Sequence, residues 1–431
     1  MGEMMASTED PQREFALDVV RRLVEAGYQA LWAGGCVRDL LLGKTPKDYD
    51  VATNAVPDEV RKIFGKRSTQ TVGANFGVII VHGPKRAGNV EVATFRTDGS
   101  YLDGRRPESV EFSTPEEDAL RRDFTINGMF YDPLEQIVLD YVGGERDLGA
   151  GIVRAIGDPH DRVREDKLRM LRAVRFAATL EFELDEVTAA AIREMAEEIH
   201  VVSVERITQE LKRMLLDPHR ARAMELSHDL GLLQECLPEL RPLFNVQNRK
   251  PSEGLWDRTL HMLSLLQQPD FELAFATLLH EWANADDAIS DESVELLCRR
   301  LRFSNRELER VVWLWKHRLS LENARELPLS QLKRLAAHDG FSELMALVRV
   351  ALLVRNGDLG SLMFVEEFVR NTPRDIINPP ELLSGNDLIQ LGMTPGPRFK
   401  ELLIAVRDAQ LNEEIQTREE AVSYLNRFLD S

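Results

Sequence analysis

The chain has 431 residues, of which 43% are hydrophobic and 29% charged, a balance typical of a water-soluble protein with about three compact domains. This composition excludes a disordered chain and a collagen-like repeat. The formal net charge of −18 is divided evenly, −9 over residues 1–220 and −9 over 221–431, which disfavours a protein that binds nucleic acid through a broadly basic surface.

Cysteine usage and hydropathy indicate the cellular compartment in which the protein is found. Cys36, Cys236 and Cys298 lie far apart and form no disulfide or zinc-binding pattern, which favours a reducing environment. No segment resembles a signal peptide, and no apolar run approaches the roughly 18 residues of a membrane span. We therefore expect a cytoplasmic protein that does not enter a membrane.

The first third of the chain predicts a small mixed sheet with helices. Apolar residues at helical spacing indicate a helix over 15–26, and Gly27 follows where a left-handed C-terminal residue is favoured. Short β-rich runs then alternate with Gly, Pro and Asn. These runs cover residues 30–33, 49–52, 78–82 and 90–95.

From about residue 156 the pattern changes to amphipathic helices, and we expect no further strand. The clearest stretches are 164–180, 187–199, 204–216 and 221–232. Asp217-Pro218 and Pro238 punctuate this region, and Asn378-Pro379-Pro380 precedes the last 50 or so residues. The predicted fold class is α+β, with a mixed N-terminal region followed by a long helical body.

Two aspartates, Asp48 and Asp50, stand at i and i+2 in a predicted strand and would project from one face of it. Neighbouring carboxylates repel each other unless a cation lies between them, and Mg²⁺ is commonly bound by one or two carboxylates together with substrate phosphates. Glu91, on a later strand, is a candidate third acid. Solvated acids at a sheet edge are the alternative for all three.

Paired glycines precede these acids. Gly34 and Gly35 end a predicted strand and open into a helix that carries Arg38. Glycines let backbone N–H groups approach a polyphosphate, the helix N-terminus adds partial positive charge, and the arginine fork grips phosphate oxygens. The nearby aspartate pair favours a phosphate site over an ordinary turn.

A further motif covers residues 121–128. Arg122 is a candidate for binding triphosphate, and Asp123 for accepting hydrogen bonds from ribose hydroxyls. Asn127, in the same motif, is a further nucleotide-binding candidate. A capped helix start with surface charges is the alternative interpretation.

Charged residues recur every three positions at Asp166, Arg169, Arg172 and Arg175, which predicts one polar stripe along a helix. Residues 162–175 carry a local net charge of +4 within an acidic protein. A carboxylate beside an arginine supplies the acceptor and donor needed to read the Watson–Crick edge of a base. A solvated, salt-bridged helix face is the alternative.

The motifs occur in the order GGCVRD, KDYDVAT, RRDFTING, REDKLRMLRAVRFA and SVERIT. In this order and spacing, over about the first 220 residues, they resemble the class II tRNA nucleotidyltransferase and bacterial poly(A) polymerase family, and the members that perform CCA addition most of all. The resemblance implies a polymerase-β-like nucleotidyltransferase head at 1–150 and a base-recognising helical neck at 151–220. It further implies a helical body at 221–377 and a tRNA-contacting tail at 378–431.

The resemblance also implies roles for individual residues. It implies transfer of CMP and AMP from CTP and ATP to the tRNA 3′ end, with Mg²⁺ ions held by Asp48 and Asp50. The base of the incoming nucleotide would be read by Asp166 and Arg169. The other implied contacts are Gly35, Arg38 and Arg122 with the triphosphate, Asp123 near the ribose, and Arg172 and Arg175 lining the same site.

Two segments resemble other parts of such enzymes. Residues 98–107 resemble a flexible loop that helps relatives switch from C to A addition, with a plain surface connection as the alternative. Residues 279–282 resemble an HD-type phosphohydrolase motif, but Glu281 follows His280 where the family has aspartate. We therefore expect no metal-dependent phosphatase site there and interpret His261 and His280 as structural.

Three alternatives stay open at this point. A bacterial poly(A) polymerase has nearly the same head motifs, although the absence of a strongly basic C-terminal segment favours the tRNA enzyme. A partial enzyme that adds only CC or only A is the second, and a non-catalytic RNA- or nucleotide-binding protein is the third. The sequence does not predict an oligomeric state.

Overall fold

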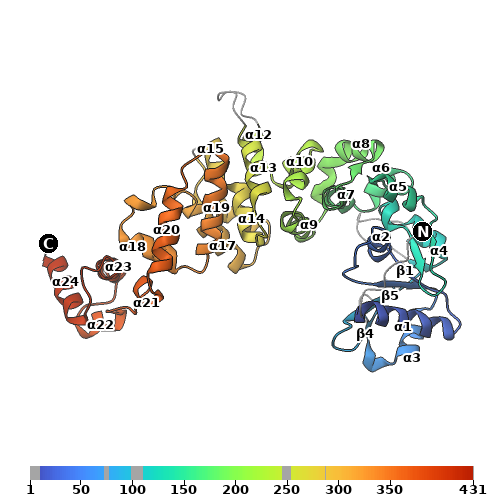
Figure 1. Ribbon diagram of the computed structural model, residues 1–431, viewed down its shortest axis with the longest axis horizontal. Helices are drawn as coiled ribbons and strands as arrows, with labels where there is room; N and C mark the ends of the chain where they lie inside the picture. Colours follow the sequence, from blue (N-terminus) through green and yellow to red (C-terminus); the bar gives the residue numbers. More distant parts are fainter. Residues whose placement is uncertain (1–9, 72–76, 99–109, 245–253, 287, 431) are drawn as a thin grey trace. The chain divides into compact units, whose positions relative to one another are not determined.

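The computed structural model describes residues 10–71, 77–98, 110–244, 254–286 and 288–430. The chain forms two compact units, Met1–Pro238 and Glu239–Ser431. Within the described residues every strand lies in the first unit, and the second is helical (Figure 1). The predicted α+β class, a small mixed sheet followed by helices, is confirmed. The boundaries of the four predicted domains stay a prediction.

The core of the first unit is a seven-stranded mixed sheet with the order β3-β4-β5-β2-β1-β8-β9. Strands β2 and β5 pair in parallel, and the other neighbours pair antiparallel. All four residues of β1, an interior strand of this sheet, are buried. The strands are β1 Ala30–Ala33, β2 Asp50–Thr53, β3 Thr69–Thr71, β4 Val78–His82, β5 Asn89–Thr94, β8 Phe130–Asp132 and β9 Ile137–Leu139.

Two small strand pairs lie outside this sheet. Strand β6 (Arg96–Asp98) pairs with β7 (Val110–Phe112), and β10 (Ile152–Val153) pairs in parallel with β11 (Glu183–Leu184). The expectation that no strand follows residue 156 is therefore wrong at β11, which is too short to show a β pattern in the sequence. The predicted switching loop falls on residues outside the described part of the chain, except for Asp98 at the end of β6.

Helix α1 (Pro11–Glu25) packs against β1, β2 and β5 through an apolar stripe. It begins four residues before the predicted start because the Asp10 side chain accepts hydrogen bonds from the backbone N–H groups of Gln12 and Arg13. It ends as predicted before Gly27, whose φ is +91°. The other helices of this region are α2 Gly35–Leu41, α3 Pro57–Phe64, α4 Pro115–Leu120 and α5 Gly144–Ala150.

Helices form the remainder of the first unit, and α7 packs against both α9 and α10. The single helix predicted over 164–180 is wrong. Helix α6 ends at Glu165, Asp166 is extended with φ −149° and ψ 104°, and its side chain accepts a hydrogen bond from the Leu168 backbone N–H at 3.0 Å as α7 begins. The helices are α6 Pro159–Glu165, α7 Leu168–Leu180, α8 Glu186–Met195, α9 Val204–Leu216, α10 Arg220–Asp229 and α11 Leu232–Cys236.

The second unit is built around α14, whose side chains are all buried except that of Glu272 and which packs against α13, α17 and α19. Its last three helices have a separate apolar core that includes Leu388, Leu402 and Leu425. No helix among the described residues is long and apolar enough to cross a membrane. The helices are α12 Arg241–Phe244, α13 Leu255–Leu265, α14 Phe271–Leu279, α15 Trp282–Ala285, α16 Asp291–Arg300, α17 Asn305–His317, α18 Leu329–Ala337, α19 Phe341–Val354, α20 Gly360–Asn371, α21 Arg374–Ile377, α22 Gly385–Gln390, α23 Pro397–Leu411 and α24 Arg418–Asp430.

Glu281 carries a fully buried carboxylate in the second unit. It accepts hydrogen bonds from Arg258 at 2.9 Å, Arg355 at 3.0 Å and Asn284 at 2.8 Å, and so links α13, α15 and α19. The adjacent His280 is buried as well, and burial lowers the pKa of its imidazole. The contacts of this pair are those of a structural cluster.

We expect Glu281→Gln to lower the free energy of unfolding of this unit by about 3 kcal/mol or more, because two guanidinium groups lose a buried charge partner. The matched control is Glu322→Gln, which removes a partly exposed partner of the same Arg355 and should cost about 1 kcal/mol or less. Calorimetry measures both, and equal losses would contradict this role of Glu281.

Candidate functional site

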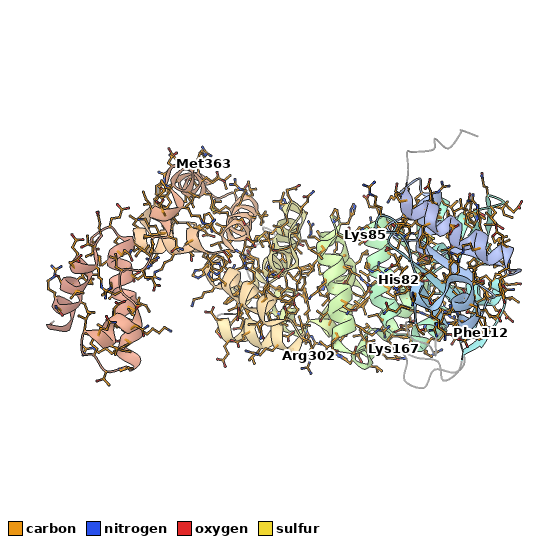
Figure 2. The ribbon with its side chains drawn as sticks, turned by 90° about the horizontal axis from the view of Figure 1, so that it is seen from below. His82, Lys85, Phe112, Lys167, Arg302 and Met363 are labelled. Carbon is orange, nitrogen blue, oxygen red and sulfur yellow. The ribbon has the colours of Figure 1, made fainter. Side chains whose placement is uncertain are left out.

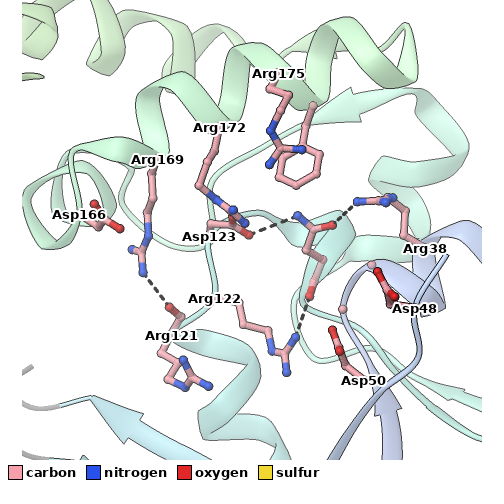
Figure 3. Close-up of a pocket in the computed structure, with 14 residues that line it drawn as sticks. Arg38, Asp48, Asp50, Arg121, Arg122, Asp123, Asp166, Arg169, Arg172 and Arg175 are labelled. Atoms are coloured by element: carbon pink, nitrogen blue, oxygen red, sulfur yellow. Dashed lines mark hydrogen bonds and ion pairs between the residues drawn. The ribbon is translucent and has the colours of Figure 1, made fainter. Parts of the chain in front are cut away.

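A cleft of about 670 Å³ in the first unit brings the predicted residues together (Figure 3). Every predicted site residue except Glu91 lines it, although they come from segments up to 140 residues apart in the sequence. Arg121 and Phe176 line it too and were not predicted. The lining residues are Gly34, Gly35, Arg38, Asp48, Asp50, Arg121, Arg122, Asp123, Asn127, Asp166, Arg169, Arg172, Arg175 and Phe176.

Asp48 and Asp50 both reach this cleft. The prediction that they share a strand is wrong for Asp48: β2 begins at Asp50, because its partner Ala33 is the last residue of β1. Asp50 is also in parallel register with Glu91 on β5. Glu91 lines an adjoining pocket of about 610 Å³, to which Asp48 and Asp50 also contribute. The three acids are therefore neighbours, with Glu91 outside the main cleft.

The electrostatics at Asp50 suit a divalent cation. Desolvation by the surrounding protein, followed by the negative charge of Glu91, raises the pKa of Asp50 to about 6, while Arg122 opposes the shift. A cation between the carboxylates would relieve this repulsion, and carboxylate oxygens are the ligands that hard divalent ions prefer. Within the described ranges, no group of three or more His, Cys, Asp and Glu side chains is arranged to hold one ion. A divalent cation here would therefore be held by the aspartate pair, and substrate phosphates would complete its coordination.

This pKa shift predicts a pH-dependent stability difference. A carboxyl with a raised pKa binds its proton more tightly in the folded state, so ionising it destabilises the protein as the pH rises from about 4 through 6. In metal-free buffer, Asp50→Asn should therefore have a higher thermal midpoint than the wild type above pH 6 and the same midpoint near pH 4. Melting curves across this range test the expectation, and a wild type that is more stable than Asp50→Asn at pH 7 would contradict it.

The glycine turn allows a close approach by Arg122. Gly34 has φ +72° and precedes α2, and a Cβ there would lie 3.0 Å from the Arg122 Nη1. The Arg122 guanidinium also donates to the backbone carbonyl of Asn127 at 3.3 Å. Glycine is thus required both by the backbone conformation and by the guanidinium packed against it.

Asp118, which was not predicted, holds this part of the wall. Its buried carboxylate accepts hydrogen bonds from Arg121 at 2.6 Å and Arg122 at 2.9 Å. Burial opposes ionisation of Asp118, but the two arginine charges outweigh burial and keep its pKa below the usual range. The spacing of Asp118 from the two arginines, i+3 and i+4 in a helical segment, is the signal that could have identified it.

Asp123 and Asn127 anchor two further arginines. Asn127 accepts a hydrogen bond from Arg38 Nη1 at 2.8 Å and donates to Asp123 at 3.3 Å. Asp123 accepts from both Nε and Nη2 of Arg172. Arg38 also pairs with its neighbour Asp39 at 2.7 Å and is 9% exposed, so little of it faces the cleft.

At the far end of the cleft, Asp166 is held by Arg206, the arginine of the SVERIT motif. Arg206 donates from Nη2 to Asp166 Oδ2 at 2.7 Å and from Nη1 to Oδ1 at 3.2 Å, and this bidentate ion pair fixes the Asp166 carboxylate. Arg169 is fixed similarly, by Glu165 at 2.5 Å and by the carbonyl of Arg121 at 3.1 Å. Nothing in the local spacing could have paired Asp166 with Arg206, which lies 40 positions away.

Arg175 completes the wall beside Phe176. It donates to the buried Glu210 at 2.6 Å, and its guanidinium lies 4.2 Å from the centre of the Phe176 ring. Desolvation lowers the pKa of Arg175, although Glu210 opposes this shift. The predicted stripe therefore continues along α7 from Arg169 to Arg175, while Asp166 joins it from the junction before the helix.

Two family models match the chain. Residues 30–154 match the poly A polymerase head domain, and residues 181–244 match the probable RNA and SrmB-binding site of polymerase A. Poly(A) polymerase I of Escherichia coli is 40% identical over 259 residues, which are 57% of this chain and 55% of that protein. The chain thus spans about half the length of this relative, as it does for the CCA-adding enzyme of Geobacillus kaustophilus.

Other relatives match along the whole chain. The CCA-adding enzyme of Lactobacillus helveticus is 32% identical over 425 residues, which are 96% of this chain and 97% of that protein. The crystal structure of the Bacillus stearothermophilus CCA-adding enzyme in complex with CTP is similar with a TM-score of 0.77 and 29% identity, and covers 98% of this chain and 99% of that one. The chain belongs to the CCA-adding enzyme family of nucleotidyltransferases.

Proposed function

We propose that this protein adds CMP and AMP, as the sequence CCA, to the 3′ end of tRNA, with CTP and ATP as substrates and Mg²⁺ as the metal ion. The observation that carries the proposal is the order of groups along one cleft: the acids Asp48 and Asp50 at one end, arginines along the wall, and the Asp166–Arg169 pair at the other. A nucleoside triphosphate has the same order of phosphate, sugar and base.

The mechanism is one of positioning and charge neutralisation, as is general for phosphoryl transfer. Mg²⁺ bound at Asp48 and Asp50 would lower the pKa of the attacking RNA 3′-hydroxyl and neutralise charge on the departing pyrophosphate. Arg122 lies beside these acids and supplies fixed donors for phosphate oxygens. The glycine turn before α2 brings its backbone to the same end of the cleft.

Base selection follows from hydrogen-bond chemistry. Cytosine and adenine each present an amino donor next to a ring-nitrogen acceptor on the Watson–Crick edge, whereas uracil and guanine present a carbonyl acceptor next to an N–H donor. Asp166 offers an acceptor and Arg169 offers donors, which match the first pattern and oppose the second. One pair of side chains can therefore accept both CTP and ATP and reject UTP and GTP.

The full-length similarity to a CCA-adding enzyme favours this reaction over polyadenylation, because the match to poly(A) polymerase I covers about half of that protein. Cys36, Cys236 and Cys298 are buried and form no disulfide within the described part of the chain, which agrees with a reducing, cytoplasmic location.

The test supplies purified protein with tRNA that lacks its 3′ CCA, and with CTP and ATP separately and together. Three added residues ending in A support the proposal. A long A tract would instead identify a poly(A) polymerase, addition of only CC or only A would identify a partial enzyme, and no extension would leave a binding protein.

A further inference from the structure

Tyr49 stands between the two cleft acids, Asp48 and Asp50, and its side chain is turned into the protein. The residue is 1% exposed, and its ring centre lies 4.8 Å from that of Trp32 on β1. Strand pairing with β1 begins at Asp50, so Asp48 and Tyr49 precede β2 and are not part of the sheet. The buried tyrosine ring therefore ties this stretch of chain to the core.

The tyrosine hydroxyl is tied in turn to the start of helix α1. It donates a hydrogen bond to Asp10 Oδ2 at 3.3 Å. The other carboxylate oxygen, Oδ1, caps the helix and accepts from the backbone N–H groups of Gln12 and Arg13 at 3.1 and 3.2 Å. Asp10 thus serves the helix with one oxygen and the tyrosine with the other. Because α1 packs against β1, β2 and β5, its capped end is a fixed point beside the sheet.

This anchor lies outside the main cleft. Tyr49 and Gln12 line the adjoining pocket of about 610 Å³ that the acids also line. The β4–β5 hairpin, which carries Lys85 (Figure 2), contributes to the lining of that pocket too. Neither Tyr49 nor Asp10 lines the main cleft. An effect of the tyrosine on a nucleotide in the cleft must therefore pass through the position of the acids.

We propose that Tyr49 is a positioning residue for the acids that hold the divalent cation, and that Asp10 anchors it through the hydroxyl. The proposal rests on the function proposed above, in which Asp48 and Asp50 bind Mg²⁺. That ion demands a nearly ideal ligand geometry, so small displacements of a carboxylate weaken its binding. The anchor keeps the stretch before β2 in place and so fixes Asp48 relative to Asp50, while neither Tyr49 nor Asp10 takes part in the reaction itself.

The test measures binding of Mn²⁺ to the purified protein, alone and with CTP but without tRNA, by electron paramagnetic resonance, and corrects for the ion that CTP itself binds. Tyr49→Phe keeps the ring and loses the hydroxyl, so the dissociation constant should rise about fivefold, part of the worth of one hydrogen bond to a charged group. Asp10→Ser preserves the helix cap but is too short to reach Tyr49, and should give the same rise. The double variant should rise no further than either single variant, because both changes break one contact.

Nucleotide addition supplies a second readout. The Mg²⁺ concentration that gives half-maximal CTP addition should rise by the same factor in both variants, while the rate at saturating Mg²⁺ should stay within about twofold of the wild type. A merely structural loss would instead lower the rate at every Mg²⁺ concentration.

Two matched controls separate this effect from general destabilisation. Tyr131→Phe removes the hydroxyl of the other tyrosine whose ring lies against Trp32, at 5.8 Å, and this hydroxyl has no hydrogen-bond partner within the described ranges. Asp158→Ser alters a cap of the same kind on α6, where the aspartate also precedes a proline and accepts from the N–H groups two and three positions further on. Both controls should bind Mn²⁺ as tightly as the wild type.

Equal Mn²⁺ affinity in Tyr49→Phe and the wild type would overturn the inference, as would a wild type that binds no Mn²⁺. Losses that multiply in the double variant, or a Tyr131→Phe variant that loses as much affinity, would also overturn it. A wild type that binds Mn²⁺, with the expected losses in the variants, but adds no nucleotide would instead refute the proposed function and leave this inference standing.

Discussion

Asp48→Asn and Asp50→Asn are each expected to reduce nucleotide addition by about a thousandfold or more. Both carboxylates line the cleft at the end where the proposed function places the phosphates, and an amide supplies neither the charge nor the second oxygen that a divalent cation requires. The loss should appear in kcat under saturating CTP, because the interaction acts on charge that develops during the reaction. Single-nucleotide extension of tRNA, resolved by gel, measures it.

Two further variants serve as controls for this prediction. Asp58→Asn removes an exposed carboxylate from the first turn of α3 and should leave the rate unchanged. Glu91→Gln should lower the rate of nucleotide addition about tenfold, since the negative charge of Glu91, in an adjoining pocket, acts on Asp50. A folded Asp48→Asn, Asp50→Asn double variant that retains addition would refute the assignment of these acids.

Asp166→Asn is expected to reduce kcat/KM for CTP and for ATP alike, by about a hundredfold each, and to relax rejection of UTP. The amide presents a donor where the amino groups of cytosine and adenine also donate, while the carbonyl of uracil can accept from it. In the proposed function one carboxylate reads both bases, so the two losses should be of similar size. Extension assays with each of the four nucleoside triphosphates give the comparison.

Asp161→Asn is the matched control for this variant. Asp161 lies on α6 in an exposed ion pair with Arg164, outside the cleft, and its loss should not change base preference. Arg206→Gln should reproduce part of the Asp166→Asn effect, since Arg206 fixes the orientation of that carboxylate. A variant that loses ATP addition but keeps CTP addition would show that the two bases are read by different groups.

Much of the fold follows from local patterns. Four β-rich runs coincide closely with β1, β2, β4 and β5, and the Asp10 cap and Gly27 bound the first helix. The break at Asp166 was missed because the helical period continues through it, although the hydrogen bond from the Leu168 backbone N–H to the Asp166 side chain is a local one of the kind that competes with a helix. The two-residue strand β11 was missed because its partner β10 lies 31 positions earlier.

The residues that line the cleft were predicted one by one, but most of the side chains that pair with them were not. Chemistry-bearing side chains such as Asp48 and Arg169 stand in recognisable motifs. Two of the acids that hold the arginines come from distant segments, Asp123 for Arg172 and Glu210 for Arg175, whereas Asp118 and Glu165 lie within four positions of their partners. The local net charge of +4 over 162–175 is therefore offset in part by Asp123 and Glu210, which lie outside that stretch of the sequence.

The pairing of arginines with acids affects how the cleft binds and releases its ligands. Each arginine that lines it already has an acidic partner, so the guanidinium groups are ordered before any nucleotide arrives and little rotational freedom is lost on binding. The same partners cancel most of the positive charge, so a polyphosphate is held by short, directional contacts more than by long-range attraction. In the proposed reaction a wall with little net positive charge favours turnover, because long-range attraction does not retain the pyrophosphate product. The pairs are Asp39 with Arg38, Asp118 with Arg121 and Arg122, Glu165 with Arg169, Asp123 with Arg172 and Glu210 with Arg175.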